Sequence, residues 1–224
     1  MTNYKWYLFD LDNTILDFSK SSKLAFFKTL EYCEINITTD IYETYSKINQ
    51  EYWQQYEKGN IDVNQLRKGR FEDFLKAINF KYDALKMSRI YLNFLVTESL
   101  EIKGALGILK TLSKTSNLAL ITNGLSKVQH KRIEKHDLKK YFKHIFISDE
   151  MGVSKPAKAF FDIVHKKIGS PNKNEVLVLG DNPDSDILGA HNFAYDALYF
   201  NYAQRNTNTI NAKFKINSWK EFII

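Results

Sequence analysis

The chain has 224 residues, 44% of them hydrophobic, and a formal net charge of +6, which predicts one domain or one domain with a large insertion. Nine glycines and three prolines argue against long low-complexity tracts, and the single cysteine, Cys33, excludes an intramolecular disulfide. No apolar run approaches the roughly 18 residues that a membrane span needs, and no signal-peptide pattern opens the sequence. We therefore expect a cytoplasmic protein without a membrane partner.

The basic residues are scattered along the chain and form no polybasic block. This pattern is typical of a solvated, lysine-rich surface, so we expect no nucleic-acid polymer as a partner. A representative set is Lys127, Lys131, Arg132, Lys135, Lys139 and Lys140.

In chain order, the first predicted element is a buried strand at Tyr4–Asp10. From Ser19 to about Ser99 the apolar spacing becomes helical, with helices expected at Val63–Ile78 and Asp83–Ser99 and a break at Gly59. This stretch contains no convincing strand. We expect an all-helical insertion of roughly 80 residues, large enough for a small core of its own.

After Gly104, short apolar runs alternate with amphipathic segments. Strands are expected at Leu118–Ile121, His144–Ser148, Val176–Leu179, Ala197–Phe200 and Phe214–Ile216. Helices are expected at Ala105–Leu112, Ser126–His136, Ala157–Ile168, Asp184–His191 and Trp219–Ile224. The alternation indicates an α/β protein with a parallel sheet covered on both faces, in which ligands bind outside the carboxyl ends of the strands.

The first of these strand ends carries Asp10 and Asp12, two residues apart. Side chains alternate along a strand, so both carboxylates fall on roughly the same side. Two like charges held so close repel each other. A divalent cation such as Mg²⁺, which prefers carboxylate and carbonyl oxygens, would remove the conflict.

Three later strand ends carry further polar residues. Alone, each is explained as a turn, a solvated loop or a helix cap, but together they supply the parts of a phosphoryl-transfer site. Asp10 can act as a carboxylate nucleophile and Asp12 as acid and base. Asp181 can complete the Mg²⁺ site, and Lys155 can offset charge on a phosphoryl group. A phosphate cradle is expected from the Thr122 hydroxyl and the backbone that follows it through Asn123 and Gly124.

These residues resemble the haloacid dehalogenase-like hydrolases over essentially the whole chain. The first signature of that family, Asp-x-Asp-x-Thr, is met by residues 10–14. The other three are met in order by Thr122, by Lys155, and by Gly180-Asp181 with Asp186 five residues on. The resemblance implies a Rossmann-like core, residues 1–16 and 101–224, with an all-helical cap domain, residues 17–100, inserted after the first strand.

The resemblance also assigns roles. It makes Asp10 the nucleophile and a metal ligand, and Asp12 the acid/base and a ligand through its main-chain carbonyl. It makes Asp181 a further metal ligand and Asp186 a supporting carboxylate or a ligand through water. Thr122 and Asn123 become phosphate contacts, and Lys155 becomes the charge clamp.

Within the family the chain looks most like the bacterial pyrimidine 5′-nucleotidases, through cap stretches such as 53–59 and 69–72 and core stretches such as 148–156. This implies a Mg²⁺-dependent phosphomonoesterase, a monomer or homodimer, whose substrate is a nucleoside monophosphate. Alternatives are a phosphoglycolate or sugar-phosphate phosphatase, or a phosphomutase. A 2-haloacid dehalogenase is disfavoured because dehalogenating members lack the second aspartate, and a non-catalytic binding protein because no catalytic residue is missing.

The cap residues are less diagnostic. We expect Arg70, or an aromatic residue such as Phe18, Trp53 or Tyr56, to contact the base or sugar, since aromatic faces stack on bases. Aromatic residues at helical spacing are more often part of a core. The linkers around residues 16–19 and 101–104 are the hinge candidates for cap movement.

Overall fold

The structure is a computed structural model that describes residues 4–207 and 209–223. The described residues form two compact units. The first, which we call the core unit, joins the N-terminal segment up to Phe18 to the chain from Leu100 onward. The second, the helical unit, is Ser19–Ser99.

The core unit is built on a parallel sheet in which the described residues contribute six strands, in the order β3-β2-β1-β4-β5-β6. The strands are β1 (Trp6–Phe9), β2 (Asn117–Thr122), β3 (His144–Ile147), β4 (Val176–Gly180), β5 (Asp196–Phe200) and β6 (Phe214–Ile216). In register, Phe9 at the end of β1 pairs with Leu120 on one side and Leu179 on the other. This order confirms the expected α/β, Rossmann-like core.

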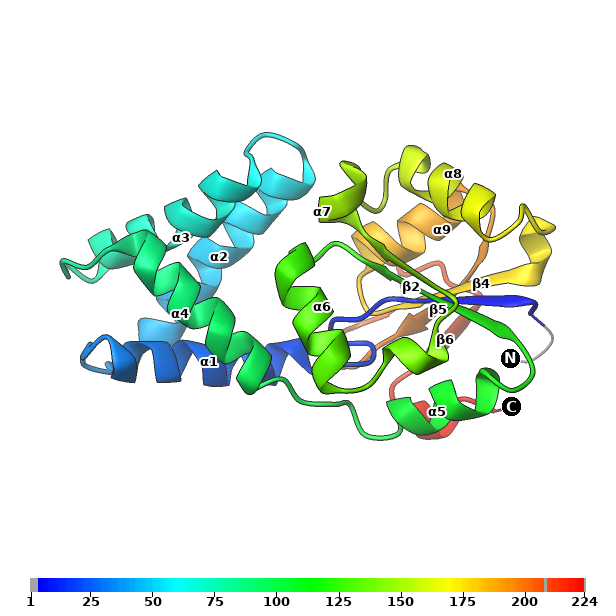
Figure 1. Ribbon diagram of the computed structural model, residues 1–224, viewed down its shortest axis with the longest axis horizontal. Helices are drawn as coiled ribbons and strands as arrows, with labels where there is room; N and C mark the ends of the chain where they lie inside the picture. Colours follow the sequence, from blue (N-terminus) through cyan, green and yellow to red (C-terminus); the bar gives the residue numbers. More distant parts are fainter. Residues whose placement is uncertain (1–3, 208, 224) are drawn as a thin grey trace. The chain divides into compact units, whose positions relative to one another are not determined.

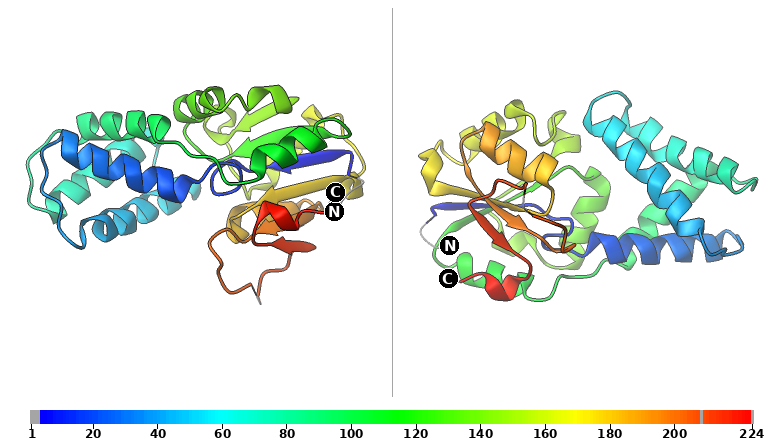
Figure 2. Two further views of the ribbon diagram at one scale, coloured as in Figure 1. Left: turned by 90° about the horizontal axis from the view of Figure 1, so that it is seen from below. Right: turned by 180° about the vertical axis from the view of Figure 1, so that it is seen from behind.

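Helices cover both faces of the sheet (Figures 1 and 2). Alternate residues of β1 show why: Tyr7 and Phe9 join one buried apolar cluster, and Trp6 and Leu8 join the other. The core-unit helices are α5 (Ala105–Leu112), α6 (Ser126–Lys135), α7 (Ser148–Met151), α8 (Lys158–Lys167) and α9 (Leu188–Asn192). The first cluster includes residues of α5 and α6, and the second includes residues of α8 and α9.

Three local features differ from the sequence expectation. The helix predicted at Asp184–His191 starts as a π-helical turn, η3 (Pro183–Ile187), and becomes α-helical only at α9. The short helix α7 was not predicted, because four residues are too few to show a periodicity. The C-terminal helix is a single 3₁₀ turn, η4 (Trp219–Glu221), and the last residue of its predicted range lies outside the described residues.

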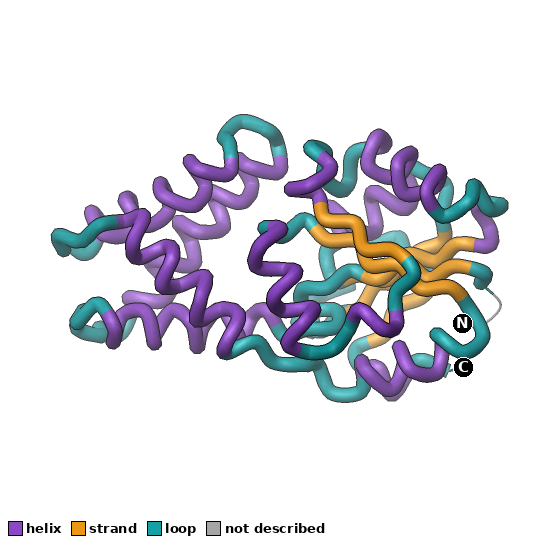
Figure 3. Tube along the Cα trace, in the orientation of Figure 1, coloured by secondary structure: helices purple, strands orange, loops and turns teal. Residues whose placement is uncertain are grey.

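The helical unit contains helix and loop alone among its described residues, as Figure 3 shows by colour. Its core is aromatic: the Tyr45 ring stacks on Phe26 at 4.4 Å and on Phe71 at 5.4 Å between centroids. Such stacked pairs contribute about 0.5–1.5 kcal/mol beyond their area burial. The helices are α1 (Phe18–Tyr32), α2 (Ile41–Glu57), α3 (Val63–Ala77) and α4 (Ala84–Thr97).

Aspartates define the starts of two of these helices. Asp62 accepts hydrogen bonds from the backbone N–H groups of Asn64 and Gln65, and the Gln65 side chain accepts from the Asp62 N–H, which makes a capping box. Asp83 caps α4 by accepting from Lys86 N. The sequence placed Asp83 inside its helix, one position too early.

The segments that lead out of and back into the core unit are hydrogen-bonded to each other. Asp17 N donates to Leu100 O at 2.9 Å, and Ile102 N donates to Ile15 O at 2.9 Å. Leu16 forms an antiparallel bridge with Glu101. Both ends of the insertion are therefore fixed next to each other at the edge of the core unit.

Within the described residues, every helix is too short or too polar to cross a membrane.

Candidate active site

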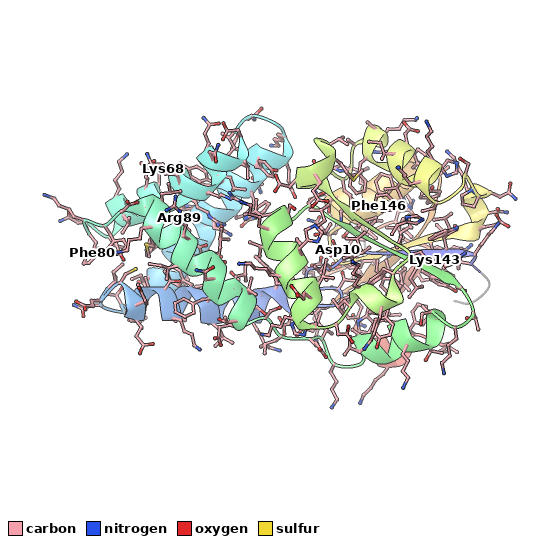
Figure 4. The ribbon with its side chains drawn as sticks, in the orientation of Figure 1. Asp10, Lys68, Phe80, Arg89, Lys143 and Phe146 are labelled. Carbon is pink, nitrogen blue, oxygen red and sulfur yellow. The ribbon has the colours of Figure 1, made fainter. Side chains whose placement is uncertain are left out.

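The site lies at the carboxyl ends of β1 and β4, the two central strands. The strand order reverses here: the chain runs outward from β1 to β3 on one side and from β4 to β6 on the other. In open α/β sheets this switch point is where ligands bind. Asp10 directly follows β1, its backbone N–H donates to Leu179 O at 2.8 Å, and its side chain is buried. Figure 4 labels Asp10 within the core unit.

Lys155 reaches Asp10 from the loop after α7. Its Nζ donates to Asp10 Oδ1 at 2.7 Å, to Asp186 Oδ1 at 2.7 Å and to the backbone carbonyl of Ile121 at 3.0 Å. The Lys155 side chain is only 1% exposed. Asn123 fixes this loop from the end of β2, because its side-chain amide donates to Lys155 O and accepts from Lys155 N.

The charges in this pocket shift one another's pKa values. Burial raises the pKa of the Asp10 carboxyl to about 7; Lys155 opposes the rise, whereas Asp186 and Asp12 add to it. Burial would lower the pKa of Lys155, but the charges of Asp10 and Asp186 outweigh it, so the net shift is upward. Burial, then the charges of Asp10 and Asp186, raises the pKa of Asp181 well above its usual range. The pocket thus holds more carboxylates than its one buried ammonium offsets.

A cation fits this excess of negative charge. Carboxylate oxygens of Asp10, Asp181 and Asp186 lie within 4.8 Å of one another, and oxygen donors of this kind suit Mg²⁺. Asp186, expected to be a supporting carboxylate or a ligand through water, belongs to this cluster: its Oδ1 accepts from Lys155 Nζ at 2.7 Å and its Oδ2 accepts from Asn182 N at 3.1 Å. Gly180 makes room for it, since a Cβ there would lie 2.2 Å from Asp186 Oδ2.

The residues expected to form a phosphate cradle lie where β2 meets the loop before α6. Thr122 is buried, and its Oγ1 accepts from Gly124 N at 3.2 Å. The hydroxyl also accepts from Gln129 Nε2 at 2.8 Å. Thr122 directly follows Ile121, whose carbonyl accepts from Lys155 Nζ, so the end of β2 meets the loop after α7 here.

The carboxylate of Asp12 is held by two residues of α6 that the sequence did not single out. Arg132 Nη1 donates to its Oδ1 at 2.5 Å, and Gln129 Nε2 donates to its Oδ2 at 2.8 Å. The expectation that Arg132 is a solvated surface residue is wrong: its side chain is 1% exposed. A signal was present, because the buried Val128 and Ile133 define a helix face on which Gln129 and Arg132 also lie.

Arg70 lies inside the helical unit. Its side chain is buried, with Nη1 donating to Asn49 Oδ1 at 2.7 Å and the guanidinium 5.2 Å from the Phe71 ring centroid and 5.3 Å from that of Tyr91. Its Nε and Nη2 have no hydrogen-bond partner among the described residues.

The three aromatic candidates have different surroundings. Trp53 and Tyr56 are half-buried on α2 and form an edge-to-face pair at 5.8 Å. Phe18 instead packs in the core unit, with its ring centroid 5.7 Å from the Arg132 guanidinium.

The fold and these residues define a hydrolase of a known class. The sequence model of the haloacid dehalogenase-like hydrolases matches residues 7–199, and the chain belongs to this family. The family expected from the four signatures is thereby confirmed.

Individual relatives extend the comparison. YfnB of Bacillus subtilis (strain 168), named as an HAD-hydrolase, is 32% identical over 90% of this chain and 86% of its own length. The pyrimidine 5′-nucleotidase YjjG of Escherichia coli (strain K12) is 31% identical over 90% of this chain and 88% of its own. The pyrimidine 5′-nucleotidase PynA of Streptococcus pneumoniae is 25% identical over 98% and 94%. The family and these relatives are consistent with phosphomonoesterase activity, as the sequence led us to expect.

A solved structure agrees with the fold throughout. The crystal structure of YfnB bound to magnesium, described as revealing interdomain movement, matches with a TM-score of 0.92 at 30% identity and covers 98% of this chain and 97% of that one.

Proposed function

We propose that this hydrolase is a Mg²⁺-dependent phosphatase that cleaves small phosphomonoesters through a phosphoaspartate on Asp10. The observation that carries the proposal is the buried contact of Lys155 with Asp10, flanked by further carboxylates and by the Thr122 hydroxyl. A carboxylate nucleophile beside a fixed ammonium is suited to attack a phosphoryl group, because the ammonium offsets the repulsion between two anions.

The chemistry divides into two displacements. In the first, an Asp10 oxygen attacks phosphorus, the ester P–O bond breaks, and Asp12 gives its proton to the leaving oxygen. In the second, Asp12 takes a proton from water, the water oxygen attacks phosphorus, and the bond between Asp10 and phosphorus breaks. Phosphate leaves and both aspartates return to their starting states. Lys155 and the Thr122–Gly124 segment bind the phosphoryl oxygens in both steps.

The residues that would hold Mg²⁺ are Asp10, the main-chain carbonyl of Asp12 and Asp181, with Asp186 beside them. When bound, the ion supplies positive charge to the phosphoryl group and offsets the excess of carboxylates. Asp186 also keeps Lys155 in place through its Oδ1, so it serves the ammonium as well as the metal site.

Asp12 favours a phosphatase over a dehalogenase. Displacement of halide needs no proton on the leaving group, whereas an alkoxide leaving group does. Here Asp12 is present and is held by directed hydrogen bonds.

The substrate we propose is a nucleoside monophosphate, with pyrimidine nucleotides preferred. Support comes from YjjG and PynA, both named pyrimidine 5′-nucleotidases, which this chain matches over about nine-tenths of its length or more. We propose the helical unit as the cap domain that selects the substrate. The rings of Trp53 and Tyr56 are half-buried and so more accessible for stacking on a base than Arg70, which is enclosed in the aromatic core. The unpaired nitrogens of Arg70 keep it a candidate for a substrate carbonyl.

A panel of phosphomonoesters tests the proposal. The protein is assayed for phosphate release with Mg²⁺ and with EDTA on pyrimidine and purine nucleoside monophosphates, phosphoglycolate and sugar phosphates. We expect Mg²⁺-dependent release, fastest from pyrimidine nucleotides. A preference for phosphoglycolate or a sugar phosphate would refute the nucleotide substrate, while the proposed phosphatase mechanism would stand. Isomerised sugar phosphate without phosphate release would identify a mutase, and no release from any ester would refute the phosphatase.

A further inference from the structure

Both carboxylate oxygens of Asp12 are occupied by donors from one helix. Arg132 Nη1 lies 2.5 Å from Oδ1, and Gln129 Nε2 lies 2.8 Å from Oδ2. Contacts from two directions fix the plane of the carboxylate as well as its position. A single hydrogen bond would leave the group free to rotate about its χ2 torsion, for which broad wells are normal.

The two donors are themselves fixed. Arg132 Nη1 also donates to Gln129 Oε1 at 2.8 Å, which sets the orientation of the amide so that its NH₂ faces Asp12. The side chain of Arg132 is 1% exposed, and Gln129 is equally buried. Burial of a polar side chain raises the free energy of the folded state unless the side chain is hydrogen-bonded. Gln129 and Arg132 meet this condition through Asp12 and through each other.

Gln129 links the acid/base to the phosphate cradle. Its Nε2 donates to Asp12 Oδ2 and to Thr122 Oγ1, each at 2.8 Å. Gln129 Nε2 therefore fixes the position of the Asp12 carboxylate relative to the Thr122 hydroxyl. We expect that hydroxyl to contact the phosphoryl group, and Asp12 to reach the leaving oxygen.

The backbone makes room for this arrangement. A Cβ on Gly124 would lie 2.1 Å from Gln129 Nε2 and 2.5 Å from its Cδ, so any other residue at position 124 would displace the amide. The glycine that ends the Thr122–Gly124 turn therefore has a second role besides the turn: it lets Gln129 approach Thr122 and Asp12.

We propose that Gln129 and Arg132 are positioning residues that align the Asp12 carboxylate for proton transfer. The inference rests on the proposed phosphatase function and adds two residues to its machinery. They act through Asp12 and are distinct from the groups that bind phosphate or metal. Misalignment of Asp12 slows every step in which it moves a proton, and it leaves attack by Asp10 intact when the leaving group needs no proton.

Stopped-flow kinetics with p-nitrophenyl phosphate and Mg²⁺ tests this directly. p-Nitrophenolate leaves without a proton, so phosphorylation of Asp10 stays fast in Arg132→Ala and Gln129→Ala, whereas hydrolysis of the phosphoaspartate still requires Asp12 as base. We expect each variant to release a burst of p-nitrophenolate close to one equivalent per enzyme, followed by a steady state about 10- to 100-fold slower than wild type. With phenyl phosphate, whose leaving group is more basic, the two variants should show no burst. Their turnover rate should then fall further below that of the wild type than it does with p-nitrophenyl phosphate.

Matched variants separate alignment from structural damage. Lys131→Ala, an exposed basic residue beside Arg132, should behave as wild type. Inhibition by inorganic phosphate should stay within about twofold of wild type in Gln129→Ala, because the phosphate contacts remain. If Arg132→Ala fails to fold, Gln129→Ala decides alone.

A slow single phase without a burst, or wild-type rates in Gln129→Ala, would overturn the positioning role. Absence of any Mg²⁺-dependent turnover by the wild-type protein would instead refute the phosphatase itself, so the two failures are distinguishable.

Discussion

Lys155 Nζ lies 2.7 Å from Asp10 Oδ1, although the two residues are 145 positions apart in the chain. Asp186 shares the same ammonium, and all three side chains are buried. An ammonium enclosed between two carboxylates is fixed in position, which is what a preorganised charge at a reacting centre requires.

Replacing Lys155 with alanine should therefore lower kcat/KM by about 10²–10³-fold, equivalent to about 2.7–4 kcal/mol of transition-state stabilisation. The two carboxylates would also lose their shared partner, so the melting temperature without metal should fall. Steady-state kinetics and thermal unfolding measure the two effects. Lys158→Ala, an exposed lysine three positions on, is the control. An unchanged kcat/KM would remove Lys155 from the site.

The second prediction concerns the nucleophile. Asp10→Asn should abolish turnover and leave the fold intact, because the amide is isosteric and cannot form the phosphoaspartate. Mass spectrometry of acid-quenched enzyme should show an 80 Da adduct on the wild type, about the mass of one added phosphoryl group, and none on the variant. Activity near that of the wild type would show that Asp10 is not the nucleophile.

Magnesium should stabilise the protein in the absence of substrate. Binding at 100 times the dissociation constant adds about 2.7 kcal/mol to the free energy of unfolding, which raises the melting temperature by several degrees. Asp181→Asn removes one carboxylate of the cluster and should lose most of this rise. Asp184→Asn, at an exposed position of the π-helical turn that follows, should keep it. An equal rise in both variants would place the metal elsewhere.

A fourth prediction concerns stability against pH. Asp196, at the start of β5, accepts from Tyr4 Oη at 2.7 Å and from Lys213 Nζ at 2.6 Å. Burial raises the pKa of Asp196, but the hydrogen bonds from Lys213 and Tyr4 and the Lys213 charge outweigh it, so the folded-state pKa is lowered. The stabilisation is thus present above the unfolded pKa of about 3.9 and is lost as the pH falls through the folded value.

Thermal unfolding between pH 7 and pH 3 measures this effect. Asp196→Asn should melt below the wild type near pH 7, and the two curves should converge at the acidic end. Glu31→Gln, an exposed carboxylate of the helical unit, should show no such convergence. A difference that stays constant with pH would contradict a charged contribution from Asp196.

The sequence was sufficient for the sheet and the strand-end residues because each rests on a local pattern. Apolar runs that stop at Asp10 or at Gly180-Asp181 mark both a buried parallel strand and its carboxyl end. Lys155 and Asp186 were expected at the same edge because both follow strands of that sheet, and the two side chains are hydrogen-bonded there. The hydrogen-bond partners of those side chains come from distant segments of the chain, and the spacing of apolar residues does not reveal them.

The residues that escaped prediction show this limit. Arg132 and Gln129 stand in a helix whose composition is strongly polar, so both fit a solvated face. The apolar Val128 and Ile133 on the same helix face were the one local sign of their burial, and the packing of α6 on the sheet shows it directly. The π-helical turn at Pro183–Ile187 likewise depends on the Asn182 carbonyl, which accepts from both Asp186 N and Ile187 N.

The pairing of Ile15 and Asp17 with Ile102 and Leu100 has a consequence for how such chains diversify. The two ends of the insertion are already joined by the core unit's own hydrogen bonds, so closing the gap costs little further loop entropy. Residues 19–99 could be exchanged as a cassette, or replaced by a short turn, while the strands that carry Asp10 and Asp181 keep their register. A graft at these two junctions would therefore exchange the helical unit and leave the strands of the core unit unchanged.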